Sequence, residues 1–144
     1  MNFRALTPVD AAQAYELDQQ CFPAGIAYAA EEIAAYMQMP GFHLGCVDGG
    51  ILAGMILTVG RRGCGHVITV DVDAGWRRRG IGQHLMRAAE DHYRQQGARG
   101  MRLEAAVNNA GALAFYARLG YRVVGALSGY YAPDLDALRL EKRF

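Results

Sequence analysis

The spacing of apolar and polar residues divides the chain into predicted helices and strands. Ile81, Leu85 and Ala89 recur at helical spacing, which predicts an amphipathic helix. The stretch 66–72 is instead rich in β-branched residues, which favour strands. An Asp-Gly-Gly sequence at 48–50 separates two apolar runs and is typical of a β-hairpin turn.

Capping and breaking residues limit the other elements. Asn109 is a good helix N-cap, and Gly97 and Gly120 each stop a helix. The predicted strands are residues 2–6, 43–47, 51–59, 66–72, 101–107, 121–126 and 136–143, and the predicted helices are residues 11–20, 29–39, 81–96 and 110–119. This order predicts a single α/β domain over residues 1–144, built on a sheet of mixed strand direction.

Length and charge narrow the class of protein. A chain of 144 residues with 52% hydrophobic residues is the size of one ordinary domain with its own core. The 15 Lys and Arg residues nearly balance 14 Asp and Glu residues, whereas a protein that binds nucleic acid usually carries a large basic excess. No apolar run has the length of a membrane span or a signal peptide, so we expect a cytoplasmic protein without nucleic-acid or membrane partners.

The cysteines suggest neither a disulfide framework nor a metal site. Cys21, Cys46 and Cys64 are odd in number and lie in no Cys-x-x-Cys or Cys/His ligand spacing. We therefore expect small buried side chains in a reducing compartment and no bound metal.

One stretch, GWRRRGIGQHLM at residues 75–86, is typical of an anion-binding turn. A glycine pair between a strand and a helix leaves backbone N–H groups free at the positive end of the helix, and neighbouring arginines add donors suited to phosphate. The dinucleotide fingerprint fails because Leu85 replaces its third glycine, and the P-loop fails because no Gly-Lys-Ser/Thr follows. The alternative is an exposed arginine turn that only begins a helix.

A second motif, farther along the chain, indicates the family to which this turn belongs. Residues 103–121 read LEAAVNNAGALAFYARLGY, and the two segments together resemble the GNAT acetyltransferase superfamily. The residues that match its signature are Arg77, Gly80, Gly82, Asn109, Tyr116, Gly120 and Tyr121. The chain departs from the family pattern at Ala74, where proline is frequent, and at Arg78, where glycine is common.

The resemblance implies a fold and a cofactor. It implies a mixed, mostly antiparallel sheet with flanking helices, whose fourth and fifth strands splay apart and hold the pantetheine of acetyl-CoA. The pyrophosphate is expected on the amides of the loop 77–83, and a backbone N–H of the fourth strand, which we assign to Val72, is expected to polarise the thioester carbonyl. The residues expected to bind acetyl-CoA are Val70, Val72, Arg77, Arg78, Arg79, Gly80, Ile81, Gly82, Gln83, Asn109 and Tyr116.

The expected chemistry involves three side chains. Acetyl transfer to an amine needs a proton donor for the departing thiolate and an acceptor for the proton of the amine. Tyr116 occupies the family position of the general acid. The base is Glu104, which lies among alanines on a predicted strand, or His66, or a water that His66 orders.

Aromatic residues outside both motifs suggest the acceptor site. In GNAT members that acetylate protein N-termini, such as the bacterial ribosomal-protein alanine acetyltransferases, the loop between the first two helices and the last hairpin flank the acceptor. Here these segments contain Phe22, Tyr28, Tyr130 and Tyr131, whose rings and hydroxyls suit a peptide. The sequence thus favours an N-acetyltransferase for the α-amine of a peptide or protein, monomeric or homodimeric. The alternatives are a small-molecule amine acceptor, a non-catalytic acyl-CoA-binding regulatory domain, and aromatic residues that only pack.

Overall fold

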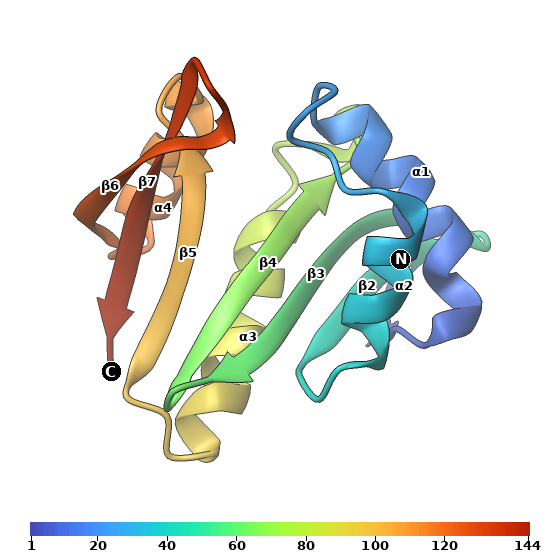
Figure 1. Ribbon diagram of the computed structural model, residues 1–144. Helices are drawn as coiled ribbons and strands as arrows, with labels where there is room; N and C mark the ends of the chain where they lie inside the picture. Colours follow the sequence, from blue (N-terminus) through green and yellow to red (C-terminus); the bar gives the residue numbers. More distant parts are fainter.

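The computed structural model describes residues 1–144 and shows a seven-stranded sheet with helices on both faces (Figure 1). The strands are β1 (Asn2–Ala5), β2 (His43–Asp48), β3 (Ile51–Arg61), β4 (Cys64–Val72), β5 (Gly100–Ala106), β6 (Arg122–Ala132) and β7 (Leu135–Arg143). The helices are α1 (Ala11–Cys21), α2 (Ala30–Gln38), α3 (Ile81–Gln95) and α4 (Ala110–Arg118), with short 3-10 turns η1 (Pro8–Asp10) and η2 (Ala74–Trp76). None of these helices has both the length and the apolar character needed to cross a membrane.

The strand order is β1-β2-β3-β4-β5-β7-β6. Every neighbouring pair is antiparallel except β4 and β5, which run parallel. Figure 1 shows α1 and α2 over the half of the sheet that contains β2 to β4, while α3 and α4 lie against the opposite face. The mixed, mostly antiparallel sheet with flanking helices that was expected from the sequence is confirmed.

Two apolar layers hold the helices on the sheet. The layer between the sheet and α3 contains Ile56, Leu85 and Leu103, and the layer beneath α1 and α2 contains Leu17 and Ile33, all of them buried. Each such side chain contributes about 2 kcal/mol to folding when it leaves water. The two layers therefore fix β3 and β4 between helices on both sides.

The sheet opens between its two parallel strands. β4 and β5 are paired only from the start of β4 to the position where His66 lies opposite Arg102. One extra residue in β4, Ile68, forms a β-bulge against β3, and bulges bend a strand. The expected splay is therefore confirmed, and the wedge widens toward the C-terminal ends of both strands (Figure 1).

The last hairpin differs from the sequence prediction. The strand predicted over residues 121–126 continues as β6 to Ala132, so the segment expected to be a loop is part of the strand. This extension is irregular, because Leu127 lies opposite Ala137 whereas Ala132 lies opposite Leu135. The prediction was wrong because the Ser and Gly residues of this segment favour turns. The pairing of the extension depends on a bulged register, which local propensities do not encode.

Candidate active site

The wedge between β4 and β5 opens into a cleft of about 1050 Å³. Most of the residues predicted to form the site line it, namely Phe22, Tyr28, Val70, Val72, Arg77, Arg78, Gly80, Ile81, Gly82, Gln83, Glu104, Asn109, Tyr116 and Tyr131. His66, Arg79 and Tyr130 lie outside this lining. The fold therefore brings both sequence motifs to one cavity.

The glycine-rich turn lies at the start of α3. Gly80 is the N-cap residue and has a φ of 77°, a left-handed conformation that favours glycine. Arg78 has a φ of 64°, so an arginine takes a left-handed conformation at the position where glycine is common in the family. No side chain caps α3, and its first N–H groups are therefore available as donors to phosphate oxygens.

The arginines of the turn have different surroundings. Arg77 folds back and donates from Nε to the carbonyl of Val72 at 3.1 Å, and Arg78 lines the cleft. Arg79 turns away, and its guanidinium carbon lies 4.8 Å from the centre of the Trp76 ring. Arg77 and Arg78 are therefore closer to a ligand in the cleft than Arg79, which packs on the outside of the turn.

The end of β4 presents backbone groups to the wedge. The N–H of Asp73 donates to the carbonyl of Ala53 on β3 at 2.8 Å. Because the backbone groups of successive residues in a strand point to opposite sides, the N–H and C=O of Val72 and of Val70 point toward β5. The carbonyl of Val72 accepts from Arg77 and, at 3.5 Å, from Sγ of Cys21. The N–H groups of Val70 and Val72 thus face a ligand that lies along β4.

Tyr116 projects from α4 into the cleft. Asn109 begins this helix, since its side chain accepts a hydrogen bond from the N–H of Ala112 at 3.1 Å. The Tyr116 ring packs edge-on against Phe115, with 5.2 Å between ring centres. Burial, and then the charge of Asp71, raises the pKa of Tyr116, so its hydroxyl stays protonated well into the alkaline range.

Glu104 and His66 lie side by side on neighbouring strands. His66 Nε2 is 2.7 Å from Glu104 Oε1, and both side chains are less than a tenth exposed. The guanidinium of Arg61 donates to His66 Nδ1 at 3.1 Å, which assigns the ring proton to Nε2 and makes His66 the donor to Glu104. Burial opposes ionisation of Glu104, but the His66 hydrogen bond and the charges of Arg139 and Arg102 outweigh it and lower the pKa of this carboxyl.

The second carboxylate oxygen of Glu104 is buried and unpartnered, on a residue that lines the cleft. Oε2 accepts no hydrogen bond within the protein and has only Nε of Arg139 beside it, at 3.5 Å. Both ring nitrogens of His66 are already engaged, and His66 does not line the cleft. The geometry therefore favours Glu104 over His66 as the proton acceptor, with His66 holding the carboxylate in place.

Tyrosines gather beside this carboxylate. Tyr28 and Tyr36 meet edge-on with 5.5 Å between ring centres, and Tyr130 and Tyr131 do so with 4.9 Å. Tyr28 and Tyr131 line the same cleft, so the two pairs are neighbours, and burial is the main cause that raises the pKa of Tyr28. Burial and the charge of Glu104 raise the pKa of Tyr130. Tyr36 was missed by sequence reasoning because its spacing on α2 is that of a residue packed on the sheet.

A buried pair of carboxyl groups joins β4 to the loop before α2. The hydroxyl of Thr69 bridges Asp71 and Asp18, and Asp18 accepts the N–H of Tyr28 at 2.7 Å. Burial, and then the contact with Asp18, raises the pKa of Asp71 well above its usual range. Asp71 therefore binds a proton more readily than an ordinary carboxyl, and the Asp71–Thr69–Asp18 contacts place Asp18 where it holds the backbone of Tyr28 near β4.

Replacing Asp71 by asparagine is expected to stabilise the protein at pH 8. The pKa of Asp71 is higher in the folded protein than in the unfolded chain, so as pH rises the unfolded chain loses the Asp71 proton at a lower pH. The free energy of unfolding of the wild type therefore falls as pH rises above about 4. An amide can still accept the hydrogen bond from Thr69, and it does not titrate. We expect Tm to rise by about 3 °C at pH 8, the effect of roughly 1 kcal/mol in a domain of this size, and by nothing near pH 3.5. Thermal unfolding of both variants across this pH range measures the effect, with the exposed Asp91→Asn as the control. The prediction is contradicted if the Tm of Asp71→Asn has the same pH dependence as that of the wild type.

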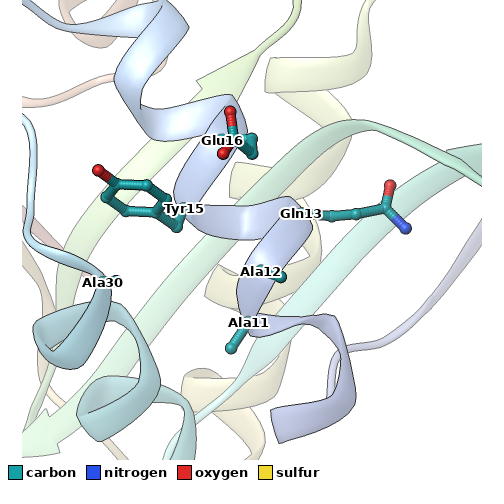
Figure 2. Close-up of a pocket in the computed structure, with 6 residues that line it drawn as sticks. All are labelled: Ala11, Ala12, Gln13, Tyr15, Glu16 and Ala30. Atoms are coloured by element: carbon teal, nitrogen blue, oxygen red, sulfur yellow. The ribbon is translucent and has the colours of Figure 1, made fainter.

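A second, shallower hollow lies between α1 and the start of α2 (Figure 2). It has a volume of about 350 Å³ and is lined by Ala11, Ala12, Gln13, Tyr15, Glu16 and Ala30. The Gln13 amide points away from the hollow (Figure 2). It accepts a hydrogen bond from the N–H of Leu52 and donates one to the carbonyl of Gly50. Three of its six lining residues are alanines and no set of polar groups converges, so this hollow lacks the features of a binding site.

The chain matches a known family over most of its length. Residues 11–121 match the Acetyltransferase (GNAT) family, and the chain belongs to this family. It is 34% identical over 134 residues to the N-alpha-acetyltransferase RimI of Mycobacterium tuberculosis, covering 88% of this chain and 82% of that protein. It is 38% identical over 80 residues to the N-alpha-acetyltransferase MAK3 of Arabidopsis thaliana, covering 56% of this chain and 42% of that protein. The chain thus spans less than half the length of the plant relative.

Solved structures share the fold. The ribosomal-protein-S18-alanine N-acetyltransferase of Escherichia coli superposes with a TM-score of 0.89 at 21% identity, covering 99% of this chain and 92% of that chain. An aminoglycoside 6′-N-acetyltransferase complexed with coenzyme A superposes with a TM-score of 0.83 at 20% identity, covering 99% and 97%. The GNAT fold expected from the sequence is confirmed, and the fold alone does not distinguish a protein acceptor from a small-molecule acceptor.

Proposed function

We propose that this protein is an acetyl-CoA-dependent N-acetyltransferase that transfers the acetyl group directly to an amine in a ternary complex. The observation that carries the proposal is one cleft lined by the N-terminus of α3, by Tyr116 and by Glu104, whose second carboxylate oxygen has no hydrogen-bond partner. A domain that only binds acyl-CoA needs the first of these groups and neither of the others. Catalysis is therefore favoured over a regulatory binding role.

The residues present fit acetyl-CoA. The uncapped amides around Gly82, with Arg77 and Arg78 beside them, suit a pyrophosphate, and the N–H groups of Val70 and Val72 suit the amides and carbonyl of an extended pantetheine. When bound, acetyl-CoA supplies the acetyl group as an activated thioester. The Asn109 side chain caps α4 and Arg79 packs outside the turn, so we assign both of them indirect roles.

Side chains and a backbone amide of the protein accept and donate the protons and stabilise the charge of this transfer. Glu104 Oε2 accepts the proton of the attacking amine, directly or through a water. The N–H of Val72 stabilises negative charge on the carbonyl oxygen, and the hydroxyl of Tyr116 donates to the departing sulfur. An α-amine, with a pKa of about 8, keeps a useful neutral fraction near neutral pH, whereas a lysine side chain does not.

Replacing Tyr116 by phenylalanine is expected to lower kcat by about 10²-fold, the usual scale for losing a positioned proton donor. The ring still fills its place against Phe115, so acetyl-CoA affinity and Tm should change little. Steady-state kinetics and calorimetry measure the two effects, with Tyr15→Phe outside the cleft as control. Wild-type kcat in the Tyr116 variant would mean that the thiolate leaves without help from this hydroxyl.

We further propose that the acceptor is the α-amine of a peptide or protein with a small first residue. Tyr28 and Tyr131 line the cleft together with Glu104, and their rings suit an extended backbone. Tyr36 and Tyr130 pack edge-on against these two rings and hold them in place. The N-alpha-acetyltransferase activity in the names of relatives supports the same acceptor.

Replacing Tyr131 by alanine is expected to raise KM for such a peptide about tenfold while acetyl-CoA affinity holds, because an acceptor wall is lost and the cofactor loop is untouched. Tyr15→Ala makes the same change outside the cleft and serves as the control. Initial rates at saturating acetyl-CoA give KM. An unchanged KM for peptides, together with efficient acetylation of a polyamine or aminoglycoside, would favour a small-molecule acceptor.

A further inference from the structure

Basic side chains share a face of the sheet with Glu104. Met101 and Leu103 on β5 are buried in the layer that faces α3. Because successive side chains of a strand point to opposite faces, Arg102 and Glu104 point to the other face, which carries α1 and α2 farther along the sheet. Arg139 on β7 lies opposite Glu104 and continues this row.

The row extends across neighbouring strands. Arg102 lies opposite His66 on β4 and opposite Glu141 on β7. Glu141 in turn lies opposite Arg122 on β6, which is the edge strand of the sheet. We call Arg102, Arg122 and Arg139 the basic platform.

The basic platform is open and only partly neutralised. On this face α1 packs on β3 and β4 and α2 packs on β3, so β5, β7 and β6 are left without a helix over them (Figure 1). The Nε atoms of Arg102 and Arg139 are buried and have no hydrogen-bond partner, and Arg122 is exposed. The facing carboxylates are Glu104, which accepts from His66 and forms an ion pair with Arg139 at 3.5 Å, and Glu141. Positive charge is therefore in local excess, although the whole chain has a net charge of only +1.

We propose that the basic platform selects acceptor peptides that carry Asp or Glu directly after the acetylated residue. The proposal rests on the proposed function and names the substrate class of the same site. Arg102 is two residues from Glu104 along β5, about 7 Å away, and Arg122 lies two strand spacings across from Arg102, which places it about 12 Å from Glu104. An extended peptide advances about 3.3 Å per residue, so the second and third side chains reach this distance when the α-amine contacts Glu104. The guanidinium groups of the basic platform can form charged hydrogen bonds with Asp or Glu side chains of the peptide at these positions.

Three peptides that differ only at positions two and three test the proposal. They begin Ala-Asp-Asp, Ala-Ser-Ser and Ala-Lys-Lys and continue with one shared uncharged sequence. At low salt we expect kcat/KM for the acidic peptide to exceed that for the serine peptide about tenfold, and we expect the difference to shrink as salt screens the charges. Equal values for all three peptides would overturn the proposal and leave the proposed function intact.

Substitutions of the platform arginines test whether these residues cause the preference for acidic peptides. Arg122→Gln and Arg102→Gln should each raise KM for the acidic peptide about three- to tenfold, and Arg122→Gln should leave the serine peptide unaffected. Arg122→Glu, at an exposed position, should shift preference toward the lysine peptide. Arg94→Gln removes an arginine of α3 that pairs with Asp91, and it should change nothing. An acidic preference that survives all platform variants would overturn the assignment to these arginines, and failure to acetylate any peptide would overturn the proposed function itself.

Discussion

Replacing Glu104 by glutamine is expected to lower kcat with a peptide acceptor by about 10³-fold, within the range for losing a positioned general base. The amide keeps the size of the side chain and its contact with His66, but it cannot take up a proton. Acetyl-CoA affinity should remain at the wild-type value, because the proposed phosphate site is the turn at the start of α3 and not β5, which carries Glu104. Single-turnover kinetics and calorimetry on the same preparation measure both quantities.

The pH profile separates this role from a purely structural one. Because the pKa of Glu104 is lowered, its carboxylate is ionised throughout pH 5–9, and the fall of kcat/KM below about pH 8 should follow the acceptor α-amine. A peptide whose α-amine has a lower pKa should shift the profile to lower pH by the same amount in the wild type. Near-wild-type kcat in Glu104→Gln would show that a different group accepts the proton.

Replacing Gly82 by aspartate is expected to weaken acetyl-CoA binding by at least 100-fold. The new carboxylate would stand at the start of α3, where it repels a pyrophosphate and competes for the same N–H groups. Calorimetric titration with acetyl-CoA, together with a thermal melt to show that the variant is folded, measures the effect.

Gly82→Ala separates charge from size. A Cβ at this position meets the Phe115 ring at 3.3 Å, so a small adjustment of that ring is needed and no charge is introduced. We expect Gly82→Ala to weaken binding far less than Gly82→Asp. Equal affinities for the two variants would show that the pyrophosphate does not lie on this turn.

The parts of the site that the sequence predicted are those with local signals. The turn at Gly80 and the helix capped by Asn109 each lie within one short segment, whose strand, glycine and cap residues specify its conformation. Tyr116 lies on the helix capped by Asn109, so the same segment predicts its place on that helix. The positions of these residues therefore agree with the sequence prediction at the level of the backbone.

The parts that sequence reasoning missed depend on contacts between distant segments. His66 and Glu104 were alternative bases in the sequence, and only the pairing of β4 with β5 shows that one holds the other. The link from Arg61 to His66 crosses the β3–β4 turn, and no spacing rule predicts it.

Two further differences have the same origin. The buried Asp18 and Asp71 are far apart in sequence, and the bulge in β4 and the position of α1 together bring them into contact. Arg79 belongs to the predicted anion-binding run, but the left-handed backbone at Arg78 precedes it and its side chain packs on Trp76. Side-chain direction in such a turn depends on backbone conformation, which residue type alone does not specify.

The most direct test is to incubate the protein with acetyl-CoA and peptides that begin with alanine, and to locate the acetyl group by tandem mass spectrometry. Each peptide should also contain an internal lysine and be compared with a copy whose α-amine is blocked. We predict one acetyl group per peptide, on the α-amine, with an equal release of free CoA thiol and none from the blocked copy. Acetylation of the lysine alone, or of free amines but no peptide, would contradict the proposed α-amine acceptor.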